Sequence, residues 1–312
     1  MLDTINATLY INNNYLNKLQ SFLETMQSKH TNFNTGKTTF KGGIRNMLLT
    51  VSEHRIKICG SLSKFYFGNN IQSLTHETFN LAVTELCEIT GLPFCEAKIN
   101  RLDLAQNISV EHSPSSYFDY YGERKYMHRL EQGYGLYYRN TTSERVFYDK
   151  TKDVIDNLET LPVNLISNNL LRFEVRDYGH KNICKRYQMA EVTLGKLCEP
   201  AAYRSLVSTW AAEYDKIDKY DAVPVFDDDV YRNPKQFCDQ ITYKGVQALG
   251  GQAAVMSLVK QARLRKVFHT TQQYLSIRRK VRSLGRIKSR QLVNPFIDEI
   301  NTKVLDLVRL GI

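Results

Sequence analysis

The chain has 312 residues, of which 42% are hydrophobic and 11% aromatic, so it can bury one large core or two ordinary ones. The formal net charge is +10, and neither a run of about 18 apolar residues nor a charged-then-apolar leader occurs. The six cysteines show no CxxC or zinc-ligand spacing. These features argue against a disordered, secreted or membrane-spanning protein and favour a soluble cytoplasmic one with reduced thiols.

The positive charge is concentrated near the C-terminus. From Lys235 to the end, 15 Lys and Arg stand against 4 Asp and Glu, a balance of +11, so the other residues sum to −1. A local positive field of this kind favours contact with nucleic acid. The alternative is a solvated basic helix without a ligand.

The first third of the chain predicts strands followed by one helix. We expect a short helix around residues 15–27 and two strands within 45–68. Thr75 can cap a helix whose apolar residues follow at helical spacing, and Gly91 and Pro93 end it. That helix is more typical of scaffold than of a functional site.

Residues 98–110 predict a strand with two distinct faces, since apolar and polar side chains alternate along it. A tyrosine-rich stretch at 117–138 follows, which suits either stacking on unpaired bases or packing in an edge strand. Residues 143–154 predict a further strand. The polar face of the first strand carries Arg101, Asp103 and Asn107, and the later strand carries Tyr148, Asp149 and Lys150.

The stretch from Leu170 to Tyr187 also alternates in its first half. Leu171, Phe173 and Val175 are expected to face a core, and Arg172, Glu174 and Arg176 to face the other way. An acid between two arginines costs desolvation unless a metal or an anionic ligand uses it. The simpler interpretation is that Glu174 only pairs with its neighbouring arginines. Beyond a turn at 177–179, a basic segment leads to Tyr187.

The remainder is predicted to be helical around an acidic break. Residues 187–220 are expected to be helical, and the acidic, proline-containing segment 222–234 is the best linker. The predicted architecture is α+β, with a mostly antiparallel sheet and packed helices in a catalytic domain at 1–221. A small basic all-α DNA-binding domain at 235–312 follows the linker.

The C-terminal domain is predicted to bind the backbone of duplex DNA. Two helices flank Gly250-Gly251, an arrangement similar to a helix-turn-helix. A longer basic helix covers about 270–284. It and the following loop carry the residues expected to contact the phosphate backbone in a salt-dependent manner: Arg278, Arg279, Lys280, Arg282, Arg286, Lys288 and Arg290.

Three strands end with an acid on a polar face, namely Asp103, Asp149 and Glu174. As sheet neighbours they could hold Mg²⁺ or Mn²⁺, which binds phosphate and carboxylate oxygens alike. The metal would polarise a scissile phosphate, and Lys150 and Arg172 could add positive charge. A phenol with a pKa near 10 is a poor nucleophile at neutral pH, but a nearby cation favours its phenolate. Attack by tyrosine would conserve the phosphodiester energy in a protein–DNA bond.

Several other classes of site lack their motifs. No His-x-His pair exists, which removes the metal triad of the histidine-rich relaxases and initiators. GxxxxGK[ST], GxSxG and HExxH are also absent, so ATP-driven helicase activity is unsupported.

The segments INRLDLAQNIS, RVFYDKTKDV and LLRFEVRDYGHKNICKRY occur in this order. Together they resemble the phage replication protein family typified by the filamentous phage gene II product. GSLSKFYFGNN is also similar to the N-terminal region of that family. The resemblance covers roughly residues 45–200, with a weaker likeness over 235–312.

The resemblance implies a rolling-circle initiator acting in the cytoplasm of a bacterial host. Such an endonuclease would nick double-stranded origin DNA, leave a 3′-OH for the host polymerase, and rejoin the displaced single strand after helicase-driven displacement. No membrane partner is implied. The rival hypothesis is a non-catalytic DNA-binding replication regulator or single-strand binder.

The resemblance also assigns roles to individual residues. Asp103 and Glu174 match the family's acidic positions, Lys150 matches the lysine of its Y-x-K motif, and Tyr187 matches the tyrosine of R-Y. Tyr187 is therefore the first candidate for the phosphotyrosine intermediate, and Tyr148 the second. Asp149 is a weaker metal ligand, because members of the family can carry an apolar residue there. The residues expected to bind phosphates are Lys150, Arg101, Arg172 and Arg176.

Overall fold

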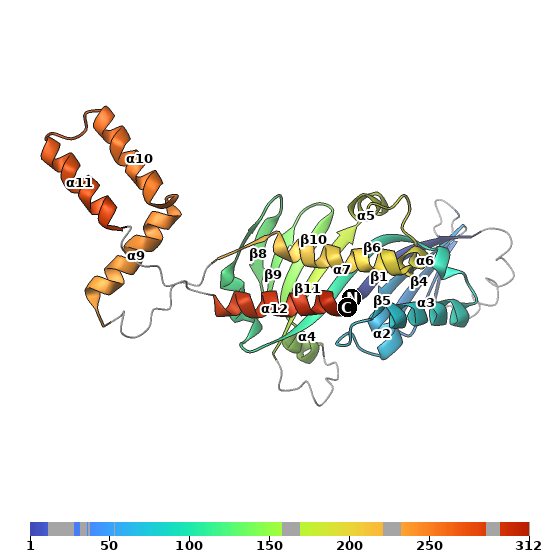
Figure 1. Ribbon diagram of the computed structural model, residues 1–312. Helices are drawn as coiled ribbons and strands as arrows, with labels where there is room; N and C mark the ends of the chain where they lie inside the picture. The colour runs from blue at the N-terminus through green and yellow to red at the C-terminus, as the bar shows by residue number, and fades with distance from the viewer. Residues whose placement is uncertain are drawn as a thin grey trace. The chain divides into compact units, whose positions relative to one another are not determined.

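The computed structural model describes residues 1–11, 28–31, 36, 38–52, 54–157, 169–220, 232–284 and 294–311. The helix expected around 15–27 lies outside these residues. The chain forms two compact units, one of Met1–Tyr220 with Phe296–Ile312 and one of Asp221–Pro295. Figure 1 labels their elements.

The first unit is built on a ten-stranded antiparallel sheet. The strands lie in the order β2-β3-β4-β5-β1-β6-β11-β10-β9-β8, so strands distant in the sequence meet at its centre. This arrangement confirms the predicted α+β fold with a mostly antiparallel sheet. The strands are β1 (Leu2–Tyr10), β2 (Ser28–Thr31), β3 (Thr38–Ile44), β4 (Met47–Ser52), β5 (Arg55–Ser61), β6 (Lys98–Val110), β8 (His128–Gln132), β9 (Gly135–Arg139), β10 (Ser143–Asp149) and β11 (Asn169–Tyr178).

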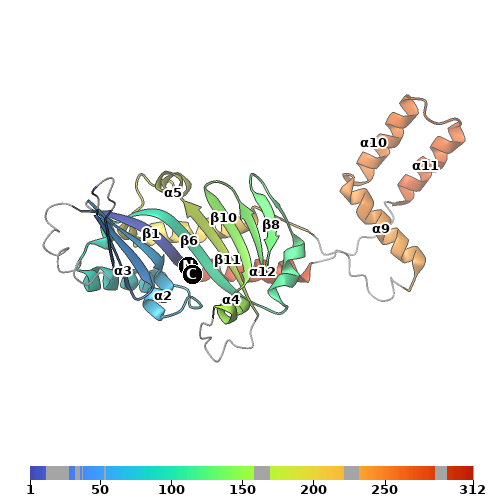
Figure 2. The same cartoon turned by 180° about the vertical axis from the view of Figure 1, so that it is seen from behind.

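Helices cover one face of this sheet. In Figure 1, α7 (Pro200–Asp215) and α12 (Pro295–Leu310) run across the front of the strands, whereas Figure 2 shows the central strands from the other side. A small sheet pairs β7 (Tyr121–Arg124) with β12 (Ile217–Lys219). The other helical segments are α2 (Leu62–Phe67), α3 (His76–Thr90), η2 (Phe94–Glu96), η3 (Pro114–Tyr120), α4 (Lys150–Asp156), α5 (His180–Tyr187) and α6 (Leu194–Leu197).

The side chains of β11 alternate as predicted. Phe173 is fully buried, stacks on Phe147 with ring centroids 4.4 Å apart, and lies 5.4 Å from the ring of Trp210 on α7. The indole Nε1 of Trp210 donates to the backbone oxygen of Phe173 at 3.2 Å. The odd-numbered side chains of β11 therefore face α7, and the even-numbered ones face away from it.

The helix expected after Thr75 is confirmed as α3. Thr75 and Thr78 form reciprocal capping hydrogen bonds, and Gly91 ends the helix at a φ of 64°. Of the apolar residues expected at helical spacing, Phe79, Ala82, Val83 and Leu86 are buried, whereas Ile89 is 48% exposed.

Three elements differ from the sequence prediction. The strand expected over 143–154 ends at Asp149, because the Asp149 carboxylate accepts from the backbone N–H of Lys152 at 3.0 Å and starts α4. In the same way, Ser61 accepts from the N–H of Lys64 at 3.1 Å and starts α2, where a strand was expected to continue. The segment 187–220 holds α6, α7 and the short strand β12 instead of one helix.

The second unit contains α9 (Pro234–Ala248), α10 (Gly251–Leu264) and α11 (Thr271–Leu284). Gly250 and Gly251 have φ values of 88° and 84°, which only glycine adopts without strain, and they separate α9 from α10. The amide of Gln252 on α10 donates to the backbone oxygen of Val281 on α11 at 2.9 Å.

The final helix does not belong to this unit, although a basic helical domain extending to residue 312 was expected. Ile297, Ile300 and Val304 of α12 are buried in the core of the sheet unit. The hydroxyl of Tyr214 on α7 donates to Asn301 at 2.8 Å, and that of Tyr117 donates to Glu299. Among the described residues, no helix is long and apolar enough to cross a bilayer.

Candidate functional site

The three motif-bearing strands β6, β11 and β10 are neighbours at the centre of the sheet. Their register places Arg176 opposite Asp103, and Arg172 opposite both Asn107 and Tyr148. Directly opposed residues of antiparallel strands share a face, so these side chains gather on the face turned away from α7. We call this set the polar face: Asp3, Arg101, Asp103, Asn107, Tyr148, Arg172, Glu174 and Arg176.

Glu174 lies at the centre of the polar face and is buried. Its carboxylate accepts from Arg172 Nε at 2.6 Å, from Arg176 Nε at 2.7 Å and from the hydroxyl of Tyr148 at 2.9 Å. Burial alone would raise the pKa of Glu174, but the two guanidiniums outweigh it and lower that pKa to about 2. Glu174 is thus held by its neighbouring arginines, as the simpler interpretation of the sequence has it.

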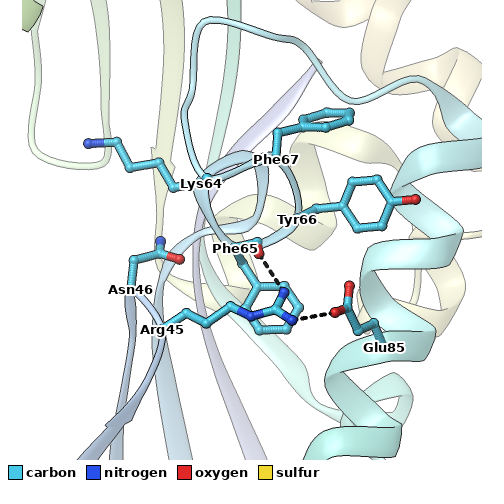
Figure 3. A pocket seen from close by; sticks show the side chains of 8 residues that line it. Arg45, Asn46, Lys64, Phe65, Tyr66, Phe67 and Glu85 are labelled. Carbon is cyan, nitrogen blue, oxygen red and sulfur yellow. Dashed lines mark hydrogen bonds and ion pairs between the residues drawn. The ribbon is translucent and has the colours of Figure 1, made fainter. Parts of the chain in front are cut away.

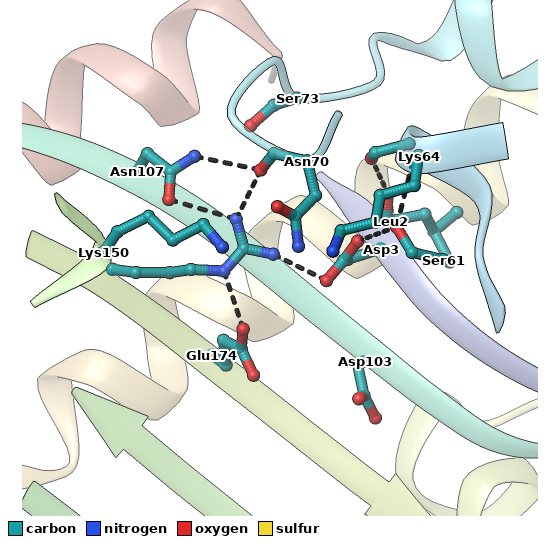
Figure 4. A network of polar contacts seen from close by, with 12 residues as sticks. Leu2, Asp3, Ser61, Lys64, Asn70, Ser73, Asp103, Asn107, Lys150 and Glu174 are labelled. Carbon is teal, nitrogen blue, oxygen red and sulfur yellow. Dashed lines mark hydrogen bonds and ion pairs between the residues drawn. The ribbon is translucent and has the colours of Figure 1, made fainter. Parts of the chain in front are cut away.

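Arg172 connects Glu174 to Asp3 and Asn107, which Figure 4 labels. Its Nη2 donates to Asp3 of β1 at 2.6 Å, and its Nη1 donates to the Asn70 backbone oxygen at 2.8 Å and to Asn107 at 3.0 Å. The Arg172 side chain is only 2% exposed. Its role is therefore to hold strands β1, β6 and β11 and the turn at Asn70 together.

Asp3 and Asn70 are members of this network that the sequence did not predict. Asp3 falls in a strand whose pairing with β6 contains register shifts, which blur the alternation that identified the other strands. Asn70 contributes a backbone oxygen, which carries no side-chain signal.

Asp103 is the second buried carboxylate of the polar face. It accepts from Arg101 Nε at 2.9 Å and from Arg101 Nη2 at 2.6 Å. Burial raises the pKa of Asp103 to about 7, although the hydrogen bonds and positive charge of Arg101 act to lower it. The side chains of Arg101 and Arg176 remain 34% and 23% exposed. They are the members of this face that a phosphate could reach from solvent.

The acids expected to hold a metal do not converge as a set. Asp103 and Glu174 share the polar face, but Asp149 caps α4, and the amine of Lys150 pairs with Asp153 at 2.7 Å. No group of three or more His, Cys, Asp or Glu side chains in the described part of the chain is arranged to hold a metal ion. The three carboxylates of the polar face are balanced by the guanidiniums of Arg101, Arg172 and Arg176. As they lie, these side chains do not fit Mg²⁺ or Mn²⁺.

Tyr187 lies on the opposite face of the sheet. Its hydroxyl donates to Asp177 at 3.0 Å, and Asp177 is paired with Arg145 at 3.3 Å and Arg186 at 3.0 Å. Helix α5 places Tyr187 on the side of the sheet that α7 covers. The expected meeting of Tyr187 with Asp103 and Glu174 therefore does not occur. Of the two candidate tyrosines, Tyr148 is the one beside Glu174.

The basic residues predicted on the helix at about 270–284 lie on α11. Arg279, Lys280 and Arg282 are exposed, and Arg278 is partly buried with its guanidinium 5.9 Å from the ring of Tyr274. Arg263 of α10 lies 4.3 Å from the same ring. The three remaining members of the predicted set, Arg286, Lys288 and Arg290, lie outside the described residues.

Comparison with protein families gives a match over residues 1–196 to the model for the N-terminal region of the gene II replication-associated protein of phages. The chain belongs to this phage replication protein family. The match confirms the resemblance seen in the three strand motifs, and it begins at residue 1 instead of residue 45. A search of curated proteins gave no match.

Family membership supports a role for this chain as an initiator of phage DNA replication. The matched region includes β1, β6, β10 and β11, and thus every strand that contributes to the polar face. It ends before α7 and does not include the helical unit. The part of the chain that matches the family is thereby the part that builds the polar face.

Proposed function

We propose that this chain initiates rolling-circle replication by nicking and rejoining DNA on the polar face, with Tyr148 as the nucleophile. The observation that supports this most is the hydroxyl of Tyr148, which donates to a carboxylate that two arginines hold in place. A phenol, a proton acceptor and guanidiniums are the groups that phosphodiester transesterification needs.

In the proposed step, Tyr148 Oη attacks the phosphorus and its proton passes to Glu174. A bond forms between Oη and phosphorus, and the bond from phosphorus to the 3′ oxygen breaks. The departing 3′ oxygen takes a proton from Asp103, whose pKa of about 7 leaves it partly protonated near neutral pH. The products are a tyrosyl 5′-phosphate and a 3′-OH. The reverse reaction rejoins the strand, because the phosphodiester energy is retained.

The substrate itself would activate Glu174. At rest the carboxylate is a weak base, because Arg172 and Arg176 hold its pKa at about 2. A scissile phosphate offers Arg176 a competing bidentate partner. When Arg176 turns toward that phosphate, Glu174 loses one of its two cations, and its affinity for the proton of Tyr148 rises. Proton transfer is thereby coupled to the presence of DNA.

The nucleophile is tested with a supercoiled plasmid that carries the replicon's own origin. Tyr148→Phe is expected to lower nicking by about a thousandfold or more and to abolish the covalent adduct with a labelled 5′ end, because no phenol remains to attack. Glu174→Gln should lose nicking while retaining binding. A Tyr148→Phe protein that still forms the adduct would overturn the assignment.

The same assay separates this enzyme from a non-catalytic DNA-binding regulator, which would bind the origin and leave the plasmid intact in every variant. Run with Mg²⁺, with Mn²⁺ and with a chelator, it also tests the predicted metal. Nicking in the chelator would indicate that the arginines of the polar face suffice. Strict dependence on the ion would require the guanidiniums to leave their carboxylates before it binds.

The helical unit is proposed to hold the duplex near the origin. Residues 235–284 carry ten Lys and Arg against one acid, Asp239. Each phosphate contact contributes about −0.9 to the slope of log affinity against log salt. Arg279→Gln is therefore expected to make that slope shallower by about one, as measured by fluorescence anisotropy with a duplex. Lys125→Gln, at an exposed site on the sheet unit, serves as the control and should leave the slope unchanged.

A further inference from the structure

A hollow of about 600 Å³ opens beside α2, and none of the residues of the polar face lines it. Three consecutive aromatic residues, Phe65, Tyr66 and Phe67, line it together with Arg45 and Lys64 (Figure 3). We call it the aromatic hollow. Its volume is in the range of small-molecule sites in proteins, roughly 300–1,000 Å³.

The wall of the hollow combines aromatic rings with fixed positive charge. The guanidinium of Arg45 lies 4.7 Å from the centroid of the Phe65 ring, donates to the Phe65 backbone oxygen at 2.8 Å and pairs with Glu85 at 2.5 Å. The rings of Tyr66 and Phe67 meet edge to face with centroids 4.9 Å apart, and both are only partly buried. Such a combination suits stacking with a nucleobase, whose phosphate lies near the cations.

The turn that carries Arg45 and Asn46 is fixed in place. The backbone of Arg45 is left-handed, with a φ of 53°. Strand β5 packs tightly against this turn, because a Cβ atom added at Gly60 would lie 2.8 Å from the backbone oxygen of Asn46. The amide of Asn46 donates to the Ser61 backbone oxygen at 2.8 Å. Its own side-chain oxygen is buried and, among the described residues, has no hydrogen-bond partner. The wall is thus pre-organised and retains an unused acceptor.

The aromatic hollow is linked to the polar face through α2. Ser61 is the N-cap of this helix, and its hydroxyl donates a hydrogen bond to the carboxylate of Asp3. The same carboxylate accepts from Arg172 at 2.6 Å. The six residues of α2 span about 9 Å at 1.5 Å each. At about 3.4 Å per nucleotide along a stacked strand, that length corresponds to about two or three nucleotides.

From these observations we infer that the aromatic hollow binds an unpaired base of the single strand that extends from the cleavage point. The inference rests on the proposed function in one respect, namely that single-stranded DNA lies on the polar face. The partly exposed rings of Tyr66 and Phe67 would stack on the base, and Arg45 and Lys64 would attract the adjoining phosphates. The bound strand would then be held at a fixed distance from Tyr148.

The probe is a fluorescein-labelled oligothymidylate, and binding to the full chain is followed by anisotropy at about 0.2 M salt to weaken non-specific contacts. Stacking of one base accounts for roughly 5- to 150-fold in affinity. Phe67→Leu keeps an apolar side chain of similar size but loses the ring, so a loss in that range is expected. Phe67→Tyr keeps the ring and should bind like the parent protein.

Tyr126→Ala is the matched control, because Tyr126 is 81% exposed and has Lys125 at 4.9 Å from its ring, yet lies outside the hollow. Unchanged affinity in Phe67→Leu, or an equal loss in Tyr126→Ala, would overturn the inference. A second measurement uses an oligonucleotide with photoreactive 5-iodouracil. Its cross-link is expected within residues 65–67, and a cross-link confined to α9–α11 would contradict the inference.

The two hypotheses fail separately. If Phe67→Leu keeps its affinity for the oligonucleotide while Tyr148→Phe loses nicking, the inferred base-binding role of the aromatic hollow is wrong, and the assignment of Tyr148 as nucleophile is retained. If Tyr148→Phe still nicks the plasmid while Phe67→Leu loses affinity for the oligonucleotide, base binding in the aromatic hollow is supported, and the assignment of Tyr148 as nucleophile is wrong.

Discussion

The two faces of the central sheet each carry a cluster of arginines, carboxylates and one tyrosine. On the polar face, Tyr148 donates to Glu174 at 2.9 Å, and on the other face Tyr187 donates to Asp177 at 3.0 Å. We call the latter set the covered cluster: Arg124, Arg145, Asp177, Arg186, Tyr187, Glu213 and Lys216. The composition of the two clusters is nearly the same, so composition alone does not identify the site.

What distinguishes the clusters is the elements that they join. Glu213 of α7 binds Arg145 of β10 at 2.8 Å and Arg186 of α5 at 3.1 Å, so the covered cluster attaches two helices to the sheet. On the polar face, the pair between Arg172 and Asp3 joins β11 to β1, and the pairs of Arg101 with Asp103 and of Glu174 with its two arginines lie within single strands, so these pairs attach no helix. The covered cluster therefore stabilises the packing of α5 and α7 on the sheet. On the polar face, Arg101 and Arg176 are partly exposed, whereas Tyr148, Asp103 and Glu174 are buried.

The largest expected effect on stability comes from Glu213→Gln. Glu213 is 1% exposed and serves four cations, Arg124, Arg145, Arg186 and Lys216. Its loss leaves Arg145 buried with Asp177 as its remaining acid, so we expect destabilisation by about 3–5 kcal/mol. Urea unfolding followed by the fluorescence of Trp210, the single tryptophan, measures this change in the sheet unit.

Glu174→Gln is the matched variant on the polar face, and we expect a smaller loss of stability from it. Arg172 keeps Asp3, Asn107 and the Asn70 backbone oxygen as partners, and Arg176 can reach solvent. Equal destabilisation by the two variants would show that both clusters serve the fold alike.

Alternation in the sequence was sufficient to predict which side chains share a strand face, but not which residues of other strands they meet. Alternation along β6 and β11 placed Arg101, Asp103, Arg172 and Glu174 correctly, because a strand has a fixed period of two. That period says nothing about the partner strand or its register. The antiparallel pairing that brings Tyr148 beside Glu174 depends on the whole sheet.

The separation of Tyr187 from Asp103 and Glu174 could not be predicted, for a related reason. Gly179, at a φ of 83°, donates its N–H to the Asn100 backbone oxygen at 2.8 Å, and α5 begins directly after it. The direction in which a helix leaves a strand is set by such tertiary contacts. The helix α12 presents the same problem, since it was expected in the basic helical domain at 235–312, yet Ile297, Ile300 and Val304 are buried in the sheet unit.

The pH dependence of stability should also differ between the two faces. Asp103 has a pKa of about 7 in the folded chain against an ordinary value of 3.8. Between these pH values the folded state binds a proton that the unfolded state lacks, so stability falls as the pH rises from about 4 to 7. The total change is at most a few kcal/mol, at about 1.4 kcal/mol per unit of pKa.

Asp103→Asn is expected to remove this component, so the difference in unfolding free energy between parent and variant should change steadily between pH 4 and 7. The carboxylate of Glu213 behaves in the opposite way, because Arg145 and its neighbours overcome the effect of burial and lower its pKa. Its contribution is present above about pH 4.5 and is lost only in stronger acid. A difference that stays constant over pH 4–7 would contradict the assignment to Asp103.

The smallest expected effect comes from Tyr187→Phe. This variant removes one hydrogen bond to Asp177, whose carboxylate keeps Arg145 and Arg186, so stability should fall by only about 1–2 kcal/mol. Nicking of the origin plasmid and formation of the 5′ adduct should persist at temperatures where the variant is folded, because the hydroxyl of Tyr187 faces α7 and not the polar face. Loss of the adduct in a folded Tyr187→Phe protein would mean that α5 must leave Asp177 during the reaction, and the covered cluster would then be part of the active site.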